Sequence, residues 1–115
     1  MLAGTYDIIC DQGATFRRII SVVNSDDSLP DYTSSTAKMQ VRVSFDSATV
    51  IIELTTENGG IVLENNTITL FISADDTTIL PIGSYRYDLE IKTGTEVIRL
   101  VQGSFKVSPE ITRAA

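Results

Sequence analysis

The sequence contains no histidine, so the side chains that could act in catalysis or bind a metal ion are chiefly its fifteen carboxylates and its one thiol. A cysteine nucleophile needs a histidine or cationic neighbours that stabilise its thiolate. Cys10 instead ends the strand-like run 6–10, and we interpret it as a small buried hydrophobic residue. A single cysteine also excludes an intramolecular disulfide bond.

Two acidic clusters could supply oxygen ligands for a cation. Asp26 and Asp27 lie close to Asp31, and Asp75 is followed directly by Asp76. Neither cluster has the ligand spacing and the glycine of a calcium-binding loop. We interpret both clusters as solvated turns, with a weak calcium site as the alternative, and we expect no metal and no cofactor.

Paired carboxylates could also catalyse glycoside hydrolysis. The candidates are Glu53, Glu57, Glu64, Asp88 and Glu90. They fall on polar strand faces or in turns, where carboxylates are ordinarily solvated, and so small a domain has little room for a deep cleft. The Asn58-Gly59-Gly60 stretch lacks the lysine and helix of a phosphate-binding loop, so it predicts a turn. We therefore expect that the protein is not an enzyme.

Length and charge narrow the remaining classes. The 115 residues form one domain of ordinary size, spanning 1–115. The net charge of −6 opposes binding to nucleic acid, which depends on clustered lysine and arginine. No apolar run approaches the roughly 20 residues that a membrane span needs. No N-terminal targeting segment is visible, so we expect folding in a cytoplasm and no contact with a membrane.

The elements that position these residues are predicted to be strands. Residues 85–91 alternate with a period of two, which places Tyr85, Tyr87, Leu89 and Ile91 on one face. Turn signals at intervals of about 8 to 12 residues predict seven or eight strands, at 6–10, 16–23, 37–45, 50–55, 61–63, 67–73, 85–91 and 97–107. This pattern predicts an all-β, antiparallel β-sandwich, with a barrel as the alternative. The loop 24–35 should make the Greek-key crossing.

Several local expectations follow from the same patterns. Met39, Val41, Val43 and Phe45 should point into the core, as should Ile68, Leu70 and Ile72 on the strand 67–73. Leu29 and Tyr32 should anchor the loop 24–35. Residues 74–80 could form one helical turn capped by Ser73 or Asp75, and Gly103 should mark a bulge in the last strand.

Four apolar residues fall on strand faces that should meet solvent: Ile19, Val23, Ile51 and Phe71. Either bulges bury them, or they form an exposed surface that binds another protein. Under the second interpretation, Ile19, Ile51 and Phe71 are candidate contacts with a partner or with a second copy of the chain. A smaller alternative is a basic surface made by Arg17, Arg18, Lys38 and Arg42.

The chain also resembles a family of small, uncharacterised proteins from tailed phages and prophages. The stretches that carry this resemblance are 6–7 (YD), 12–18 (QGATFRR), 37–42 (AKMQVR), 54–61 (LTTENGGI), 85–91 (YRYDLEI), 99–103 (RLVQG) and 107–113 (VSPEITR). More distantly, it is similar to the immunoglobulin-like N-terminal domain of phage upper baseplate proteins.

The resemblance implies an immunoglobulin-like sandwich that is made in the bacterial host cytoplasm and built into the virion. The implied role is a structural adaptor of the tail or baseplate that contacts other virion proteins. A head decoration protein is one alternative, and a carbohydrate-binding module that uses Tyr6 and Tyr32 is another. Tyr85 follows the Pro81-Gly83 corner, where such sandwiches often place a tyrosine whose hydroxyl bonds back to the chain.

Overall fold

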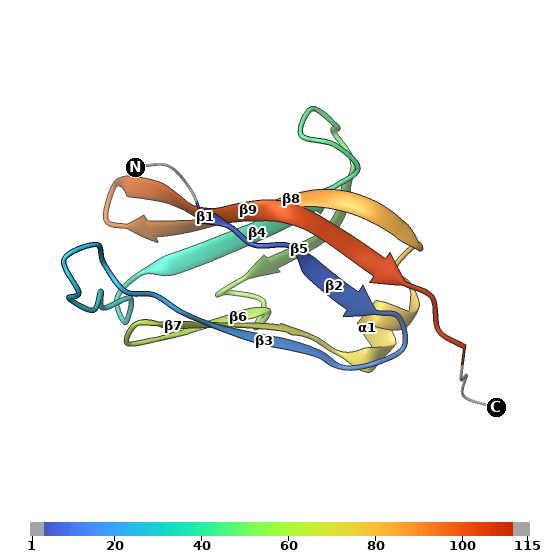
Figure 1. The fold of residues 1–115 in the computed structure, drawn as a ribbon, viewed down its shortest axis with the longest axis horizontal. Helices are drawn as coiled ribbons and strands as arrows, with labels where there is room; N and C mark the ends of the chain where they lie inside the picture. The colour runs from blue at the N-terminus through green and yellow to red at the C-terminus, as the bar shows by residue number, and fades with distance from the viewer. Residues whose placement is uncertain (1–3, 112–115) are drawn as a thin grey trace.

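The computed structural model describes residues 4–111 and shows two β-sheets packed face to face as a sandwich (Figure 1). Residues 1–3 and 112–115, including the end of the stretch 107–113, lie outside the described residues. The large sheet contains β1 (Gly4–Thr5), β2 (Ile8–Asp11), β4 (Thr36–Arg42), β5 (Val50–Thr55), β8 (Gly83–Thr93) and β9 (Glu96–Ser108). The small sheet contains β3 (Phe16–Ser21), β6 (Ile61–Glu64) and β7 (Thr67–Ile72). The predicted all-β sandwich is confirmed, with nine strands in the described range.

The order of the strands is that of an immunoglobulin-like sandwich. One sheet runs β9-β8-β4-β5 and the other runs β3-β7-β6, which correspond to the G-F-C-C′ and B-E-D sheets of such folds. The segment 22–35 carries the chain from β3 in the small sheet to β4 in the large one, as the Greek-key crossing requires. Because the two sheets stay separate, the barrel alternative is wrong.

Most strands pair antiparallel, as expected, and the first two strands are the exception. Both β1 and β2 pair parallel with β9, for example Ile8 with Phe105 and Cys10 with Val107. A parallel pair needs a long connection between its strands. Here nearly the whole domain supplies it, because the first and last strands are neighbours in the large sheet.

The core lies between the two sheets. The alternation of apolar and charged residues along β8 correctly predicted which of its side chains enter the core. Tyr85, Tyr87, Leu89 and Ile91 are all buried. Phe105 on β9 is fully buried, and the centroid of its ring lies 6.5 Å from that of Tyr87 in an edge-on arrangement. The small sheet contributes its inward residues Phe16, Ile68, Leu70 and Ile72, which are also buried.

The predicted bulge in the last strand exists, but it does not lie at Gly103. Gly103 pairs regularly with Tyr87, whereas the register slips where Leu89 faces Val101 and Glu90 faces Arg99. Leu100 is therefore the extra residue. Gly103 has a different constraint, because a Cβ atom there would lie 2.5 Å from the carbonyl oxygen of Tyr6.

The inward placement of Val43 and Phe45 is wrong, because β4 ends at Arg42. The backbone N–H of Ser47 donates to the carbonyl of Ser44, and the Arg42 guanidinium donates to the carbonyl of Ser47. This turn lifts residues 43–45 away from the sheet before β5 begins. Val43 is 54% exposed and Phe45 is 93% exposed as a result.

The loop between β3 and β4 is anchored by Tyr32 but not by Leu29. Tyr32 packs against the core, and its N–H donates to the carbonyl of Asn65 over 2.8 Å. Leu29, which follows the small turn closed by the bond from the Asn24 N–H to the Ser28 carbonyl, is 63% exposed.

The predicted helical turn and tyrosine corner are both present. Helix α1 (Ala74–Thr78) is capped by Ser73, whose hydroxyl accepts from the N–H of Asp76. The chain then turns through Pro81 into β8. The Tyr85 hydroxyl donates to the Pro81 carbonyl over 2.8 Å, which is the contact of a tyrosine corner.

Candidate functional site

The three candidate interface residues come from both sheets, and Ile19 and Phe71 share the outer face of the small sheet. Ile19 is 65% exposed on the outer face of the small sheet, opposite Thr69 on β7. Phe71 on β7 is half-buried, and Ile51 is half-buried on β5 of the large sheet, where it packs against the core. Both interpretations of the out-of-phase residues are therefore partly right: Ile19 is exposed, whereas Ile51 contributes to the core.

The structure brings Ile51 and Phe71 together in a groove of about 460 Å³. The groove runs between β5, which belongs to the large sheet, and β7 with α1, which close the small-sheet side. We call it the β5–α1 groove; its lining residues include Ile51, Leu54, Gly60, Phe71, Ile79 and Leu80. Ile19 does not line it.

Ile79 is a residue of this groove that the sequence analysis missed. It is the C-cap residue of α1 and is 78% exposed. The available signal was its place directly after the helical turn, next to the buried Leu80. Only one of two adjacent apolar residues at a helix end can enter the core, so the other must meet solvent or a partner.

The walls of the groove are held by local hydrogen bonds. The Asn58 side-chain oxygen accepts from the N–H groups of Thr55 and Gly60 over 3.0 and 2.8 Å, and its amide donates to the carbonyl of Glu53. On the other wall, the Arg17 guanidinium lies 5.2 Å from the centroid of the Phe71 ring, as in a cation–π contact. The groove is therefore preformed.

One wall of the groove is also the edge of a sheet. Within the described residues, β5 pairs only with β4. An edge strand has N–H and C=O groups along its free side that can accept a further strand. On β5, the Asn58 side chain already bonds to the Thr55 N–H and the Glu53 carbonyl, so a further strand would pair with the residues before Glu53. The groove thus offers an apolar surface next to a backbone that can form hydrogen bonds.

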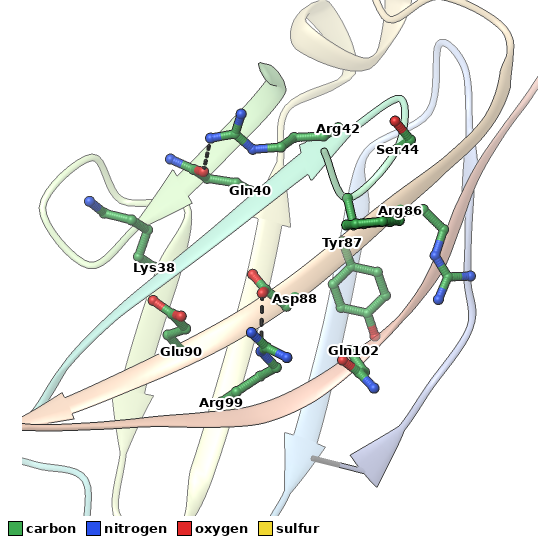
Figure 2. Close-up of a pocket in the computed structure, with 11 residues that line it drawn as sticks. Lys38, Gln40, Arg42, Ser44, Arg86, Tyr87, Asp88, Glu90, Arg99 and Gln102 are labelled. Carbon is green, nitrogen blue, oxygen red and sulfur yellow. Dashed lines mark hydrogen bonds and ion pairs between the residues drawn. The ribbon is translucent and has the colours of Figure 1, made fainter. Parts of the chain in front are cut away.

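A second concave surface lies on the outer face of the large sheet (Figure 2). It encloses about 490 Å³ and crosses β4, β8 and β9. We call it the basic hollow; its lining residues are Lys38, Gln40, Arg42, Ser44, Phe45, Arg86, Tyr87, Asp88, Glu90, Arg99 and Gln102. Four cations and two carboxylates give it a net charge of +2 in a chain of net charge −6.

The charges in the basic hollow are unevenly paired. Arg99 and Asp88 form an ion pair of 3.3 Å, one of the two dashed contacts in Figure 2. Arg42 lies directly opposite Arg86 in the β4–β8 register, an arrangement of like charges that is unfavourable in a sheet. Figure 2 shows the two guanidinium groups turned away from each other, with Arg42 beside Gln40.

The basic surface expected from Arg17, Arg18, Lys38 and Arg42 does not form as one unit. Arg17 and Arg18 are on β3 of the small sheet, whereas Lys38 and Arg42 are on β4 of the large sheet. Arg18 is used locally, because it lies over the Phe16 ring and donates to the carbonyl of Ile9.

The structure places the candidate chemical groups apart from one another. Cys10 is fully buried, and burial raises the pKa of its thiol from 9.0 to about 11. Asp26 accepts hydrogen bonds from the side chain and N–H of Ser28, and Asp31 accepts equivalent bonds from Thr33. These bonds lower the pKa of both carboxyl groups.

Within residues 4–111, no group of three or more histidine, cysteine, aspartate or glutamate side chains is arranged to hold a metal ion. No helix in that range is long and apolar enough to cross a membrane. Of the two tyrosines considered for sugar binding, Tyr6 is 40% exposed, whereas Tyr32 packs against the core.

Comparisons with known proteins add a fold-level likeness. No protein-family model and no curated protein matches the chain. Among solved structures, it is similar to an extracellular domain of the voltage-gated sodium channel beta4 subunit, in work describing parallel homodimers and cell–cell adhesion. The identity is 10%, the TM-score is 0.40, and the match covers 96% of this chain and 97% of that one. A likeness at this level carries no argument about function.

Proposed function

We propose that this protein is a non-catalytic structural adaptor of a phage particle, located at the tail or baseplate. The place in a virion is supported by the resemblance of seven stretches of the sequence to a family of small tailed-phage proteins. The adaptor role is supported by one structural observation, the preformed β5–α1 groove at the edge of the large sheet.

The groove suits a neighbouring virion protein that presents an extended apolar segment. Ile51, Phe71 and Ile79 would contact its side chains, while the part of the β5 edge before Glu53, which Asn58 does not occupy, would bond to its backbone. Exposed apolar side chains beside an unpaired strand are costly to leave in water, so a permanent partner would stabilise this edge.

The location is tested on purified particles from the strain that carries the gene. Mass spectrometry should find the protein at a fixed copy number, and immunogold labelling should place it at the tail end. Gold over the head would refute the adaptor role and support a head decoration protein instead. Absence from particles, with the antibody shown to work on denatured protein, would refute a virion role, and a glycan array would then test the carbohydrate-binding alternative.

The groove is tested with substitutions that leave the fold intact. Ile79 is exposed, so Ile79→Asp should keep the unfolding temperature and lower incorporation into particles about tenfold, since a central apolar contact contributes more than about 1 kcal/mol. Val97→Asp, at the start of β9 and 54% exposed, is the matched control and should incorporate normally. Equal incorporation of both variants would exclude the groove.

Phe71→Ser provides a second readout at the same site. We expect a folded monomer with weakened assembly, because Phe71 is only half-buried. If this variant unfolds, Phe71 belongs to the core, and the assignment of the groove then depends on Ile79→Asp alone.

A further inference from the structure

The loop between β3 and β4, residues 22–35, is a concentrated source of negative charge. It contains Asp26, Asp27 and Asp31, and the sequence has no lysine or arginine between Arg18 and Lys38. The hydrogen bonds from Ser28 and Thr33 fix the positions of two of these carboxylates. Leu29 adds an apolar side chain that is 63% exposed at the same tip. We call this segment the acidic loop.

The basic hollow has the complementary character. Its two carboxylates are matched within it, since Asp88 is paired with Arg99 and Glu90 lies opposite Lys38 on β4. Arg42 and Arg86 then remain. Within residues 4–111 neither forms an ion pair within 4.0 Å, and the charge of Arg86 acts on the Asp7 carboxylate, whose pKa is lowered by hydrogen bonds from Ser104 and also by the Arg86 guanidinium. Phe45, 93% exposed, stands at the border of the hollow.

The acidic loop does not occupy the basic hollow of its own chain. The N–H groups of Val22 and Tyr32 donate to the carbonyls of Asn66 and Asn65, which tie the loop to the β6–β7 turn of the small sheet. The hollow lies on the outer face of the other sheet, and none of residues 22–35 lines it. In Figure 1 the loop extends from the end of the sandwich.

We propose that the acidic loop of one copy docks in the basic hollow of a second copy of this chain. Asp26 and Asp27 would approach Arg42 and Arg86, while Leu29 would contact Phe45. Guanidinium–carboxylate contacts are directional and strengthen when they are shielded from water. This proposal uses a different surface from the β5–α1 groove and does not rest on the virion role.

The contact joins two different surfaces, so it is heterologous. After the first contact forms, one copy keeps an unused hollow and the other keeps an unused loop. Such contacts repeat from copy to copy and yield a closed ring or an open filament. A twofold dimer with both surfaces buried is the symmetric exception, in which each copy exchanges its loop with the other.

Charge reversal with full-length protein tests the contact directly. In sedimentation velocity at low ionic strength, the wild-type mass should rise with concentration and fall when salt screens the charges. The hollow variant Arg42→Glu/Arg86→Glu and the loop variant Asp26→Lys/Asp27→Lys should each raise the dissociation constant at least about tenfold. An equimolar mixture of the two should associate again, because each then presents a surface complementary to the other.

Controls separate this contact from general charge effects. Lys106→Glu and Glu64→Lys make single charge reversals of the same kind outside both surfaces and should leave association unchanged. Arg42 has structural bonds to Ser47 and Gln40, so Arg86→Glu alone is the safer hollow variant. No hydrogen bond in residues 4–111 involves the Arg86 side chain, so its reversal should leave the domain folded. Any change in unfolding temperature would come from the opposed Arg42 and the nearby Asp7.

Three results would overturn the proposal. The first is a wild-type protein that stays monomeric at all accessible concentrations at low ionic strength. The second is association that neither reversal weakens, which would assign the contact to another surface. The third is a mixture of hollow and loop variants that stays monomeric, since complementary charges would then not be what joins the copies.

Discussion

Gly103 is the position where a single methyl group should be most disruptive. It is buried in β9, and an added Cβ would lie 2.5 Å from the carbonyl oxygen of Tyr6 and 2.9 Å from its carbonyl carbon. Ordinary van der Waals contact begins at 3.4 Å, so the segment Tyr6–Asp7 would have to move by about 1 Å. Both nearest atoms of Tyr6 belong to the backbone, so no side-chain rotation can relieve the clash.

The cost can be worked out from what holds this segment in place. The Tyr6 N–H donates to the carbonyl of Gln102 over 2.9 Å, and the Ser104 N–H donates to the Asp7 carboxylate over 3.0 Å. The Tyr87 hydroxyl donates to the Tyr6 carbonyl. Three bonds at about 1 kcal/mol each predict that Gly103→Ala lowers the free energy of unfolding by about 3 kcal/mol.

Urea unfolding followed by circular dichroism measures this change, which corresponds to a decrease of roughly 10–15 °C in Tm. Gly4→Ala is the matched control in the neighbouring β1–β9 pair. Its added Cβ would lie 3.6 Å from the Val101 side chain, an ordinary contact, so no loss is expected. A loss below about 1 kcal/mol for Gly103→Ala would refute the argument that the N-terminal segment is pinned against β9 by this close approach.

Two further predictions concern the corner and the thiol. Tyr85→Phe removes the hydroxyl that donates to the Pro81 carbonyl and should lower the free energy of unfolding by about 1 kcal/mol; unchanged urea unfolding would show that the corner contact adds nothing. Because burial raises the pKa of Cys10 from 9.0 to about 11, the folded state is fully stabilised below pH 9 and loses stability as the pH rises toward 11. Relative to Cys10→Ala, the wild type should lose roughly 1 kcal/mol at about pH 10, halfway through that window; a difference in unfolding free energy that does not change with pH would contradict the burial of the thiol.

Local patterns in the sequence were sufficient for much of the fold. The alternation of β8 identified four buried residues because a strand side chain points to one face or the other and only one face meets the core. Ser73 was one of two expected helix caps, because a side-chain oxygen at that position can satisfy an N–H group that the first helical turn leaves free. These contacts lie within a few residues of each other along the chain, so their residue types suffice to predict them.

Contacts between distant segments were not predictable in the same way. The turn that exposes Phe45 depends on the bond from Arg42 to Ser47, and the slip at Leu100 depends on the pairing of β9 with β8. The positions of Ile51 and Phe71 in the alternating patterns of their strands identified them as candidate interface residues. These positions could not show that the two residues share one groove with Ile79.

The sequence by itself determined the class of fold, the turns and the inward face of most strands, because these depend on side-chain type and a period of two. Only the tertiary structure decided which surfaces are available for binding. The β5–α1 groove is formed where β5 of the large sheet meets β7 and α1, and the basic hollow gathers its charges because register places Arg42 opposite Arg86. Each surface joins residues tens of positions apart, whose proximity results from the packing of the whole sandwich.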